Sequence, residues 1–356
     1  MSGDLNESTD ALTVQTSLVS LEYVFAKGNL MVIDFEHHYV PMRLARRMGI
    51  NTETRTIVEE DGVPKANIHG QLFNLEAQIQ DMDRAGIDVA VQTCILGWDT
   101  TLENCRLLND CTAEIQREYS GRFVGLAHIP PLERAPALQE LERAVGDLQL
   151  KGVTISSQIR GLSLDAPEFR PFYDAVTKLQ IPLFIHPALA PRGYELLKDY
   201  QLSVILTREF DLGVAVTRLI AGSVLERYPE LVFVISHFGG GLAGYKERIA
   251  RSSYRFKLPR SFADYFDRLY FDMAGFEGSP IALRCAMEGI RPERMVFATD
   301  YPQNFNNDDP KIGKNVNGIR EYIAEIKNLP LDADVKNDML GGTAARLLKL
   351  NGIGDW

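Results

Sequence analysis

The sequence lacks several features that would assign it to other classes of protein. No apolar run approaches the roughly 20 residues needed to span a bilayer, and residues 1–30 lack the basic and apolar segments of a signal peptide. Four cysteines (Cys94, Cys105, Cys111 and Cys285) show no paired metal-ligand spacing, and three of them fall in apolar stretches. The formal net charge of −10 argues against nucleic acid or a membrane as a partner. We therefore expect a cytoplasmic protein with a small-molecule substrate.

What the sequence does contain is a regular alternation of short apolar strands with helical patterns, which is typical of a parallel sheet. The expected strands are 31–36, 89–94, 123–129, 152–155, 182–186, 232–237, 269–273 and 295–299. Helices are expected between them at 74–85, 102–117, 135–148, 168–179, 214–227, 280–288 and 316–326. Eight such units predict an α/β fold of the (β/α)₈ TIM-barrel type. A doubly wound open sheet is the alternative, but no Gly-rich phosphate loop follows the first strand.

The expected domain organisation is a short N-terminal extension, residues 1–30, followed by the barrel, residues 31–356. Residues 49–73 have weak periodicity and are interpreted as an inserted loop or hairpin over the active face. Residues 302–317 are polar, with repeated Asn and Asp, and indicate a long loop after the eighth strand.

Ionisable residues gather where the expected strands end, which is where barrel enzymes place their catalytic groups. Glu36 and His38 end the first strand and share one face, because strand side chains alternate. His186, His237 and Asp300 end the fifth, sixth and eighth strands. Each residue alone has a structural explanation, such as a hydrogen-bonded core imidazole or a capping carboxylate. Together they form a reasonable ligand set for a divalent metal ion.

The motifs Glu36-x-His38, His186-Pro187, Ser236-His237-x-Gly239-Gly240 and Thr299-Asp300-Tyr301-Pro302 resemble the amidohydrolase superfamily. Within it, the Glu-x-His form resembles the group of aminocarboxymuconate-semialdehyde decarboxylase and the non-oxidative decarboxylases of resorcylate, dihydroxybenzoate and carboxyvanillate. The resemblance implies one divalent ion, Mn²⁺ or Zn²⁺, bound by Glu36, His38, His186 and Asp300. A metal-bridging Lys is missing from the end of strand four. His237 would be the neighbouring acid/base or substrate-orienting residue.

Substrate contacts are expected from residues outside the ligand set. Arg248 lies eleven residues after His237, and the resemblance implies that an Arg at this spacing contacts the substrate carboxylate. Arg55, in the inserted segment, is a second candidate for carboxylate binding, and Tyr301 could line the pocket. Gln303 and Asn304 depart from the aromatic and acidic residues that usually follow this motif, so the substrate pocket is expected to differ.

The resemblance implies decarboxylation of a hydroxylated aromatic or related unsaturated carboxylic acid, in which Asp300 protonates the carbon that loses CO₂. The alternative is a metal-dependent hydrolase of a lactone, amide or ester, or a hydratase, with Asp300 as the base. The expected partner is a small-molecule carboxylate substrate, with no nucleic acid and no membrane. A homo-oligomer, dimer or tetramer, is also expected.

Overall fold

A computed structural model describes residues 31–60, 62–197, 199–305 and 314–350. The expected N-terminal extension, residues 1–30, and the middle of the expected loop after the eighth strand lie outside the described residues. All eight expected barrel strands are present in the described part of the chain. They are β1 (Ile33–His38), β4 (Val89–Thr93), β5 with β6 (Phe123–Gly125 and Ala127–His128), β7 (Val153–Ser156), β10 (Leu183–His186), β11 (Phe233–Ile235), β12 (Tyr270–Asp272) and β13 (Met295–Val296).

The strands pair in parallel and in chain order, as a (β/α)₈ barrel requires. The third strand joins both halves of the sheet, because β5 pairs with β4 and β6 pairs with β7 on either side of Leu126. The first strand meets the segment after β13 through main-chain hydrogen bonds. Phe35 N donates to Phe297 O at 2.9 Å, and Asp300 N donates to Glu36 O at 3.0 Å. The predicted TIM barrel is therefore confirmed.

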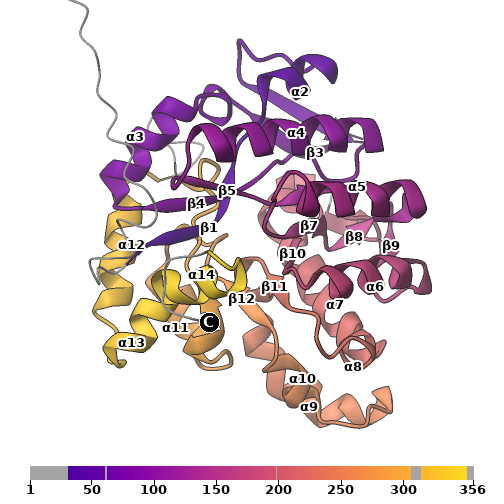
Figure 1. Cartoon of the computed structure of the whole chain (residues 1–356). Coiled ribbons are helices and arrows are strands. Elements are labelled where there is room, and N and C mark those ends of the chain that lie inside the picture. Colours follow the sequence, from indigo (N-terminus) through magenta and orange to yellow (C-terminus); the bar gives the residue numbers. More distant parts are fainter. Residues whose placement is uncertain (1–30, 61, 198, 306–313, 351–356) are drawn as a thin grey trace, which may run out of the picture.

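Helices surround the strands, as Figure 1 shows. The helices expected from sequence are α3 (Leu75–Ala85), α4 (Leu102–Glu118), α5 (Ala135–Gly146), α6 (Arg170–Leu179), α7 with α8 (Arg208–Ala221 and Val224–Arg227), α11 (Pro280–Met287) and α12 (Asn317–Lys327). Three of them begin with a side-chain cap, from Asn74, Thr101 and Ser279. Short helices that the periodicity did not predict are α2 (Met42–Arg47), α9 (Lys246–Ser252), α10 (Phe262–Phe266), α13 (Ala333–Asn337) and α14 (Thr343–Leu347).

One helix boundary was predicted wrongly, and it bears on the active site. The apolar periodicity predicted a continuous helix over residues 214–227. The structure instead begins α7 at Arg208, directly after a π-helical turn over Ser203–Thr207. A break then separates α7 from α8, because Ser223 adopts a left-handed conformation with φ 61°. The charged first turn of α7 carries no periodic apolar signal, which explains the error.

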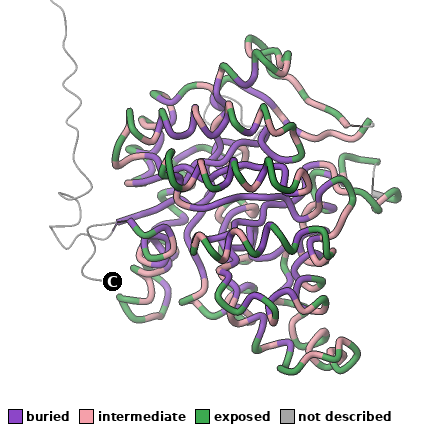
Figure 2. Tube along the Cα trace, turned by 45° about the vertical axis from the view of Figure 1, so that its right-hand side comes forward, coloured by how far each residue is buried: buried purple, intermediate pink, exposed green. Residues whose placement is uncertain are grey.

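Three apolar clusters hold the barrel together, and Figure 2 shows that the strands are buried while the outer helix faces are exposed. One cluster, including Phe35 and Phe184, joins residues of the strands to α14. A second, larger cluster packs strands against helices. The third cluster brings residues 40–72 together with Trp98 and Leu189. Burial of this third cluster fixes the inserted segment in place.

The inserted segment forms an antiparallel hairpin of β2 (Thr56–Glu60) and β3 (Val63–Ile68), one of the two forms predicted for it. Polar contacts attach the hairpin to the segment that follows barrel strand β10 and to the start of α7. Arg208 Nη2 donates to Lys65 O at 2.7 Å, and Arg192 pairs with Glu60 at 3.4 Å. The hairpin therefore lies beside the segments that follow β10. None of the helices in the described ranges has the length and apolar character needed to cross a membrane.

Candidate metal centre

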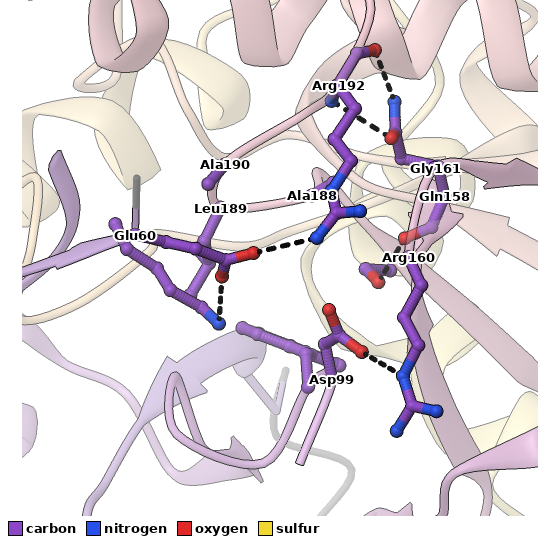
Figure 3. A pocket seen from close by; sticks show the side chains of 12 residues that line it. Glu60, Asp99, Gln158, Arg160, Gly161, Ala188, Leu189, Ala190 and Arg192 are labelled. Carbon is purple, nitrogen blue, oxygen red and sulfur yellow. Dashed lines mark hydrogen bonds and ion pairs between the residues drawn. The ribbon is translucent and has the colours of Figure 1, made fainter. Parts of the chain in front are cut away.

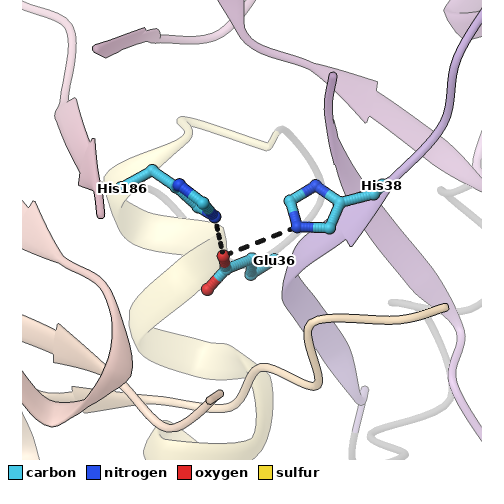
Figure 4. Close-up of side chains that lie close together, drawn as sticks. All are labelled: Glu36, His38 and His186. Carbon is cyan, nitrogen blue, oxygen red and sulfur yellow. Dashed lines mark ion pairs between the residues drawn. The ribbon is translucent and has the colours of Figure 1, made fainter. Parts of the chain in front are cut away.

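Two strands that are not neighbours in the barrel, β1 and β10, bring Glu36, His38 and His186 together at the strand ends, as Figure 4 shows. One potential ligand atom from each of the three lies within 4.8 Å of the others, and all three side chains are buried. His186 Nε2 is 2.9 Å from Glu36 Oε1, and His38 Nε2 is 3.7 Å from the same oxygen. Strand alternation correctly predicted that Glu36 and His38 share a face. His37 points elsewhere, because its ring stacks on Tyr301.

The orientation of His186 fits a metal ligand. Its Nδ1 lies 2.8 Å from the Pro187 carbonyl oxygen and must donate a proton there. Burial is the main cause that lowers the pKa of His186, so the neutral imidazole is favoured. In that form Nε2 carries a lone pair, which faces the Glu36 carboxylate. Two electron-rich atoms at 2.9 Å repel one another unless a cation lies between them, and atoms bonded to one ion at about 2.1 Å are separated by roughly 3 Å.

The charges around Glu36 also favour a cation. Burial alone would raise the pKa of Glu36, but the neighbouring imidazoles, His237 first among them, lower it well below the usual value. Burial and the charge of Glu36 raise the pKa of Asp272 well above the usual value, which favours a single negative charge on this pair of carboxyl groups. Ser236 Oγ donates to Glu36 Oε2 at 2.7 Å and orients the carboxylate. Glu36 Oε1 has no hydrogen bond among the described residues and faces the two imidazoles.

Asp300 and His237 lie next to this triad. Asp300 Oδ1 is 2.8 Å from His38 Nε2, and Asp300 Oδ2 is 3.9 Å from His237 Nε2. Both residues have left-handed backbone conformations, with φ 55° at Asp300 and φ 52° at His237. Such conformations cost free energy for residues other than Gly and gather at functional sites. The five residues predicted at the strand ends thus converge in one place.

Glu209 holds His237 in its orientation. His237 Nδ1 is 2.8 Å from Glu209 Oε1, so Nδ1–H donates to the carboxylate and Nε2 faces the triad. Burial lowers the pKa of His237, but the carboxylates of Glu209 and Glu36 outweigh that effect and raise it well above the usual value. A Cβ atom added at Gly275, which has φ +80°, would lie 2.3 Å from His237 Cγ, so only Gly leaves room for the ring.

Aromatic rings form one wall of the centre. The indole of Trp98 stacks on His186, with ring centroids 3.8 Å apart and an interplanar angle of 15°. It also meets His38 edge-on at 5.9 Å, and its Nε1 donates to Thr154 Oγ1 at 3.0 Å. His128 lies behind Trp98 at 5.8 Å, and burial lowers its pKa to about 3. Trp98 therefore fixes two ligand rings, whereas His128 is a neutral core residue.

Figure 3 shows a pocket with charged side chains, and its lining includes Trp98 of this aromatic wall. Trp98 and Leu189 contribute apolar surface to it. Ion pairs join Glu60 to Arg192 at 3.4 Å and Asp99 to Arg160 at 3.3 Å. These pairs bridge the hairpin, the loop after β4 and the loops after β7 and β10. The pocket shares Trp98 with the wall of the metal centre.

The structure places the predicted substrate-binding residues away from the centre's described contacts. Arg248 is exposed on α9 and lines a separate surface cavity. Arg55 is exposed before β2, and its Nε donates to Asn67 Oδ1 at 3.0 Å. Tyr301 is buried, and its hydroxyl donates to Asp81 Oδ2 at 2.8 Å. The assignment of these three residues to substrate binding stays a prediction.

Sequence reasoning missed three ionisable residues in or beside the centre. Asp272 ends strand β12, and an acid at the end of a buried strand was the signal already used for Asp300. Arg208 and Glu209 begin α7, where the incorrect helix boundary concealed them. No spacing rule in the sequence connects Glu209 to His237, because their contact depends on how α7 packs beside the strand that ends at Ile235.

Comparisons with known proteins agree with this geometry. The profile of the amidohydrolase family matches residues 33–350. The chain is 25% identical over 307 residues to 2-amino-3-carboxymuconate-6-semialdehyde decarboxylase of Dictyostelium discoideum, covering 82% of this chain and 81% of that protein. It is 29% identical over 307 residues to gamma-resorcylate decarboxylase of Rhizobium radiobacter, covering 80% and 90%. A solved structure of 5-carboxyvanillate decarboxylase from Novosphingobium aromaticivorans, complexed with manganese and 4-hydroxy-3-methoxy-5-nitrobenzoic acid, superposes with a TM-score of 0.73 at 20% identity, over 91% of this chain and 97% of that one.

Proposed function

The chain belongs to the amidohydrolase family, and within that family we propose that it is a metal-dependent, non-oxidative decarboxylase of a hydroxylated aromatic or related unsaturated carboxylic acid. The observation that carries the proposal is the position of Asp300, which lies between a metal-ligand triad and an imidazole that holds a proton. The names of the two curated relatives favour decarboxylation over hydrolysis or hydration.

Glu36, His38 and His186 would hold the divalent ion, with Asp300 as a further ligand. When bound, such an ion attracts the carboxylate and adjacent hydroxyl oxygens of the substrate and stabilises negative charge on them. Carboxylate ligands beside imidazoles suit Mn²⁺ as well as Zn²⁺. The manganese in the carboxyvanillate decarboxylase structure supports the first of these.

The reaction requires a proton at the carbon that bears the carboxylate. In its protonated form, Asp300 donates that proton through a carboxyl oxygen. The bond between the ring carbon and the carboxylate carbon then breaks, its electron pair restores the conjugated ring, and CO₂ leaves. Asp300 is left ionised, and His237 Nε2 lies 3.9 Å from its Oδ2 and is placed to return a proton. Glu209 keeps that imidazole protonated and correctly oriented.

We also propose that the protein is a cytoplasmic homo-oligomer. A cavity of about 470 Å³ beside α7 and α9 is lined by exposed apolar side chains, including Phe210, Val214 and Tyr245. Exposed apolar patches of this kind commonly mark protein–protein contacts. Three buried free thiols, those of Cys94, Cys105 and Cys111, suit a reducing compartment.

Isotope labelling tests decarboxylation directly. In D₂O, the product from an active hydroxybenzoate should carry one deuterium at the carbon that lost CO₂. In ¹⁸O-labelled water, the organic product should contain no solvent oxygen. A hydrolase or hydratase gives the opposite oxygen result. Solvent oxygen in the product without CO₂ release would reject the proposal.

A further inference from the structure

Arg208 occupies a position that the proposed mechanism does not use. It is the first residue of α7 and precedes Glu209, the partner of His237. Its Nε donates to Leu189 O at 3.0 Å, and its Nη2 donates to Leu189 O at 2.8 Å and to Lys65 O at 2.7 Å. The guanidinium therefore lies between the loop that follows the ligand strand β10 and the hairpin above it.

This cation has no anionic partner in the described part of the chain. All its hydrogen bonds go to main-chain carbonyls, and no carboxylate of the described residues lies within ion-pair distance. Burial lowers its pKa to about 10, although the charges of Asp300 and Glu209 raise it. The group is still fully charged at neutral pH. A partly buried charge is normally paired, and pairing with a ligand would satisfy this one.

The one Arg208 nitrogen without a described hydrogen bond, Nη1, indicates that the ligand is an anion. The carbonyls of Leu189 and Lys65 occupy Nε and Nη2, whereas Nη1 makes no hydrogen bond among the described residues. The same two carbonyls fix the plane of the guanidinium, so little side-chain entropy is lost when an anion binds. Two contacts place the guanidinium beside the centre: Glu209, the next residue in the chain, contacts His237, and Arg208 binds the carbonyl of Leu189, which lies three residues after His186.

We propose that Arg208 binds an anionic oxygen of the substrate and so makes this enzyme selective for acids. The inference rests on the proposed function, because it places the substrate of that reaction in this centre. Arg208 is distinct from Arg248 and Arg55, which are both exposed. A purely structural role is the competing explanation, since the contact with Lys65 O also fastens the hairpin.

A comparison of two unreactive ligands, one charged and one uncharged, distinguishes anion binding by Arg208 from a purely structural role. The probe is 2-hydroxybenzenesulfonate, which cannot lose CO₂, and its uncharged counterpart is 2-hydroxyphenyl methyl sulfone. Calorimetry on the Mn²⁺-loaded full chain measures Kd for both with wild type, Arg208→Met, Arg208→Lys and Arg192→Met. Arg192 is the matched control, because it also contacts the hairpin but is exposed and already paired with Glu60.

For Arg208→Met we expect sulfonate binding to weaken by about 30-fold to 1,000-fold, roughly 2–4 kcal/mol, while sulfone binding changes less than about 3-fold. Arg208→Lys keeps the charge and should bind the sulfonate about 10-fold more weakly than wild type. This variant provides the test if Arg208→Met does not fold. An equal loss of affinity for the sulfonate and the sulfone in Arg208→Met, or full retention of sulfonate affinity, would overturn the proposal. Because the probe needs no turnover, a wild type that binds sulfonate selectively but releases no CO₂ would reject the proposed function and leave Arg208 as an anion-binding residue.

Discussion

Replacing Glu209 by Gln tests the assignment of His237 as a proton-holding group. Gln keeps an acceptor for Nδ1–H but removes the charge. The atoms are 2.8 Å apart, and the side chains are only 8% and 16% exposed. A charge pair at that separation and an effective dielectric of about 20 is worth about 6 kcal/mol before desolvation is subtracted. Removal of one partner of a buried, hydrogen-bonded charge pair typically costs about 2–5 kcal/mol of interaction free energy. Because the hydrogen bond survives, we expect a loss of about 2–3 kcal/mol, which is roughly 30-fold to 150-fold in kcat.

The pH profile supplies the decisive measurement. The Glu209 carboxylate raises the pKa of His237, and the protonated imidazole is the active form. Activity is therefore present below that pKa and lost as pH rises through it. In Glu209→Gln the pKa falls toward the ordinary value, so activity should disappear at lower pH than in wild type. Glu226→Gln is the control, because Glu226 accepts a hydrogen bond from Tyr265 at 2.8 Å. An unchanged basic limb in Glu209→Gln would refute the reasoning.

Three further outcomes are expected. Chelation of the metal should abolish activity and lower the melting temperature, because an ion at 100 times its Kd adds about 2.7 kcal/mol to the free energy of unfolding. Mn²⁺ added back should restore activity at least as well as Zn²⁺. Activity with Zn²⁺ alone would contradict this metal preference. Trp98→Ala should lower the free energy of unfolding by about 3–5 kcal/mol in urea titrations, because it leaves a buried cavity where the indole packs against His186. A decrease below about 1 kcal/mol would contradict the packing argument. Arg248→Met should lower kcat/KM on an acidic substrate by an amount equivalent to about 2–5 kcal/mol, whereas unchanged kinetics would leave Arg248 as a surface residue of α9.

The fold and the convergence of the candidate metal ligands could be predicted because they depend on regular geometry. Apolar strands alternating with helices allow few topologies, and parallel strands bring their carboxyl ends to one rim. Glu36, His38, His186 and Asp300 each follow directly from that rule. The strand period also separated His38 from His37, even though the pairing of β1 with β4 is irregular between Asp34 and His37.

The surroundings of the ligands could not be predicted, because they depend on irregular backbone and on packing between distant segments. Arg208 and Glu209 follow a long connection and a π-helical turn, neither of which has a periodic pattern. The orientation of His237 depends on left-handed conformations at His237 and Phe238 and on the space left by Gly275. Asp272 is different, since its position at a strand end could have revealed it.

The stacking of Trp98 on His186 gives the protein an intrinsic optical reporter. Trp98 is one of two tryptophans in the sequence, the other being Trp356. Its indole lies parallel to a metal-ligand imidazole at 3.8 Å, so its fluorescence should respond when an ion withdraws electron density from that ring. Paramagnetic Mn²⁺ should quench the emission more strongly than Zn²⁺. In a Trp356→Phe background the occupancy of the centre could then be followed in real time, without substrate and without a coupled assay.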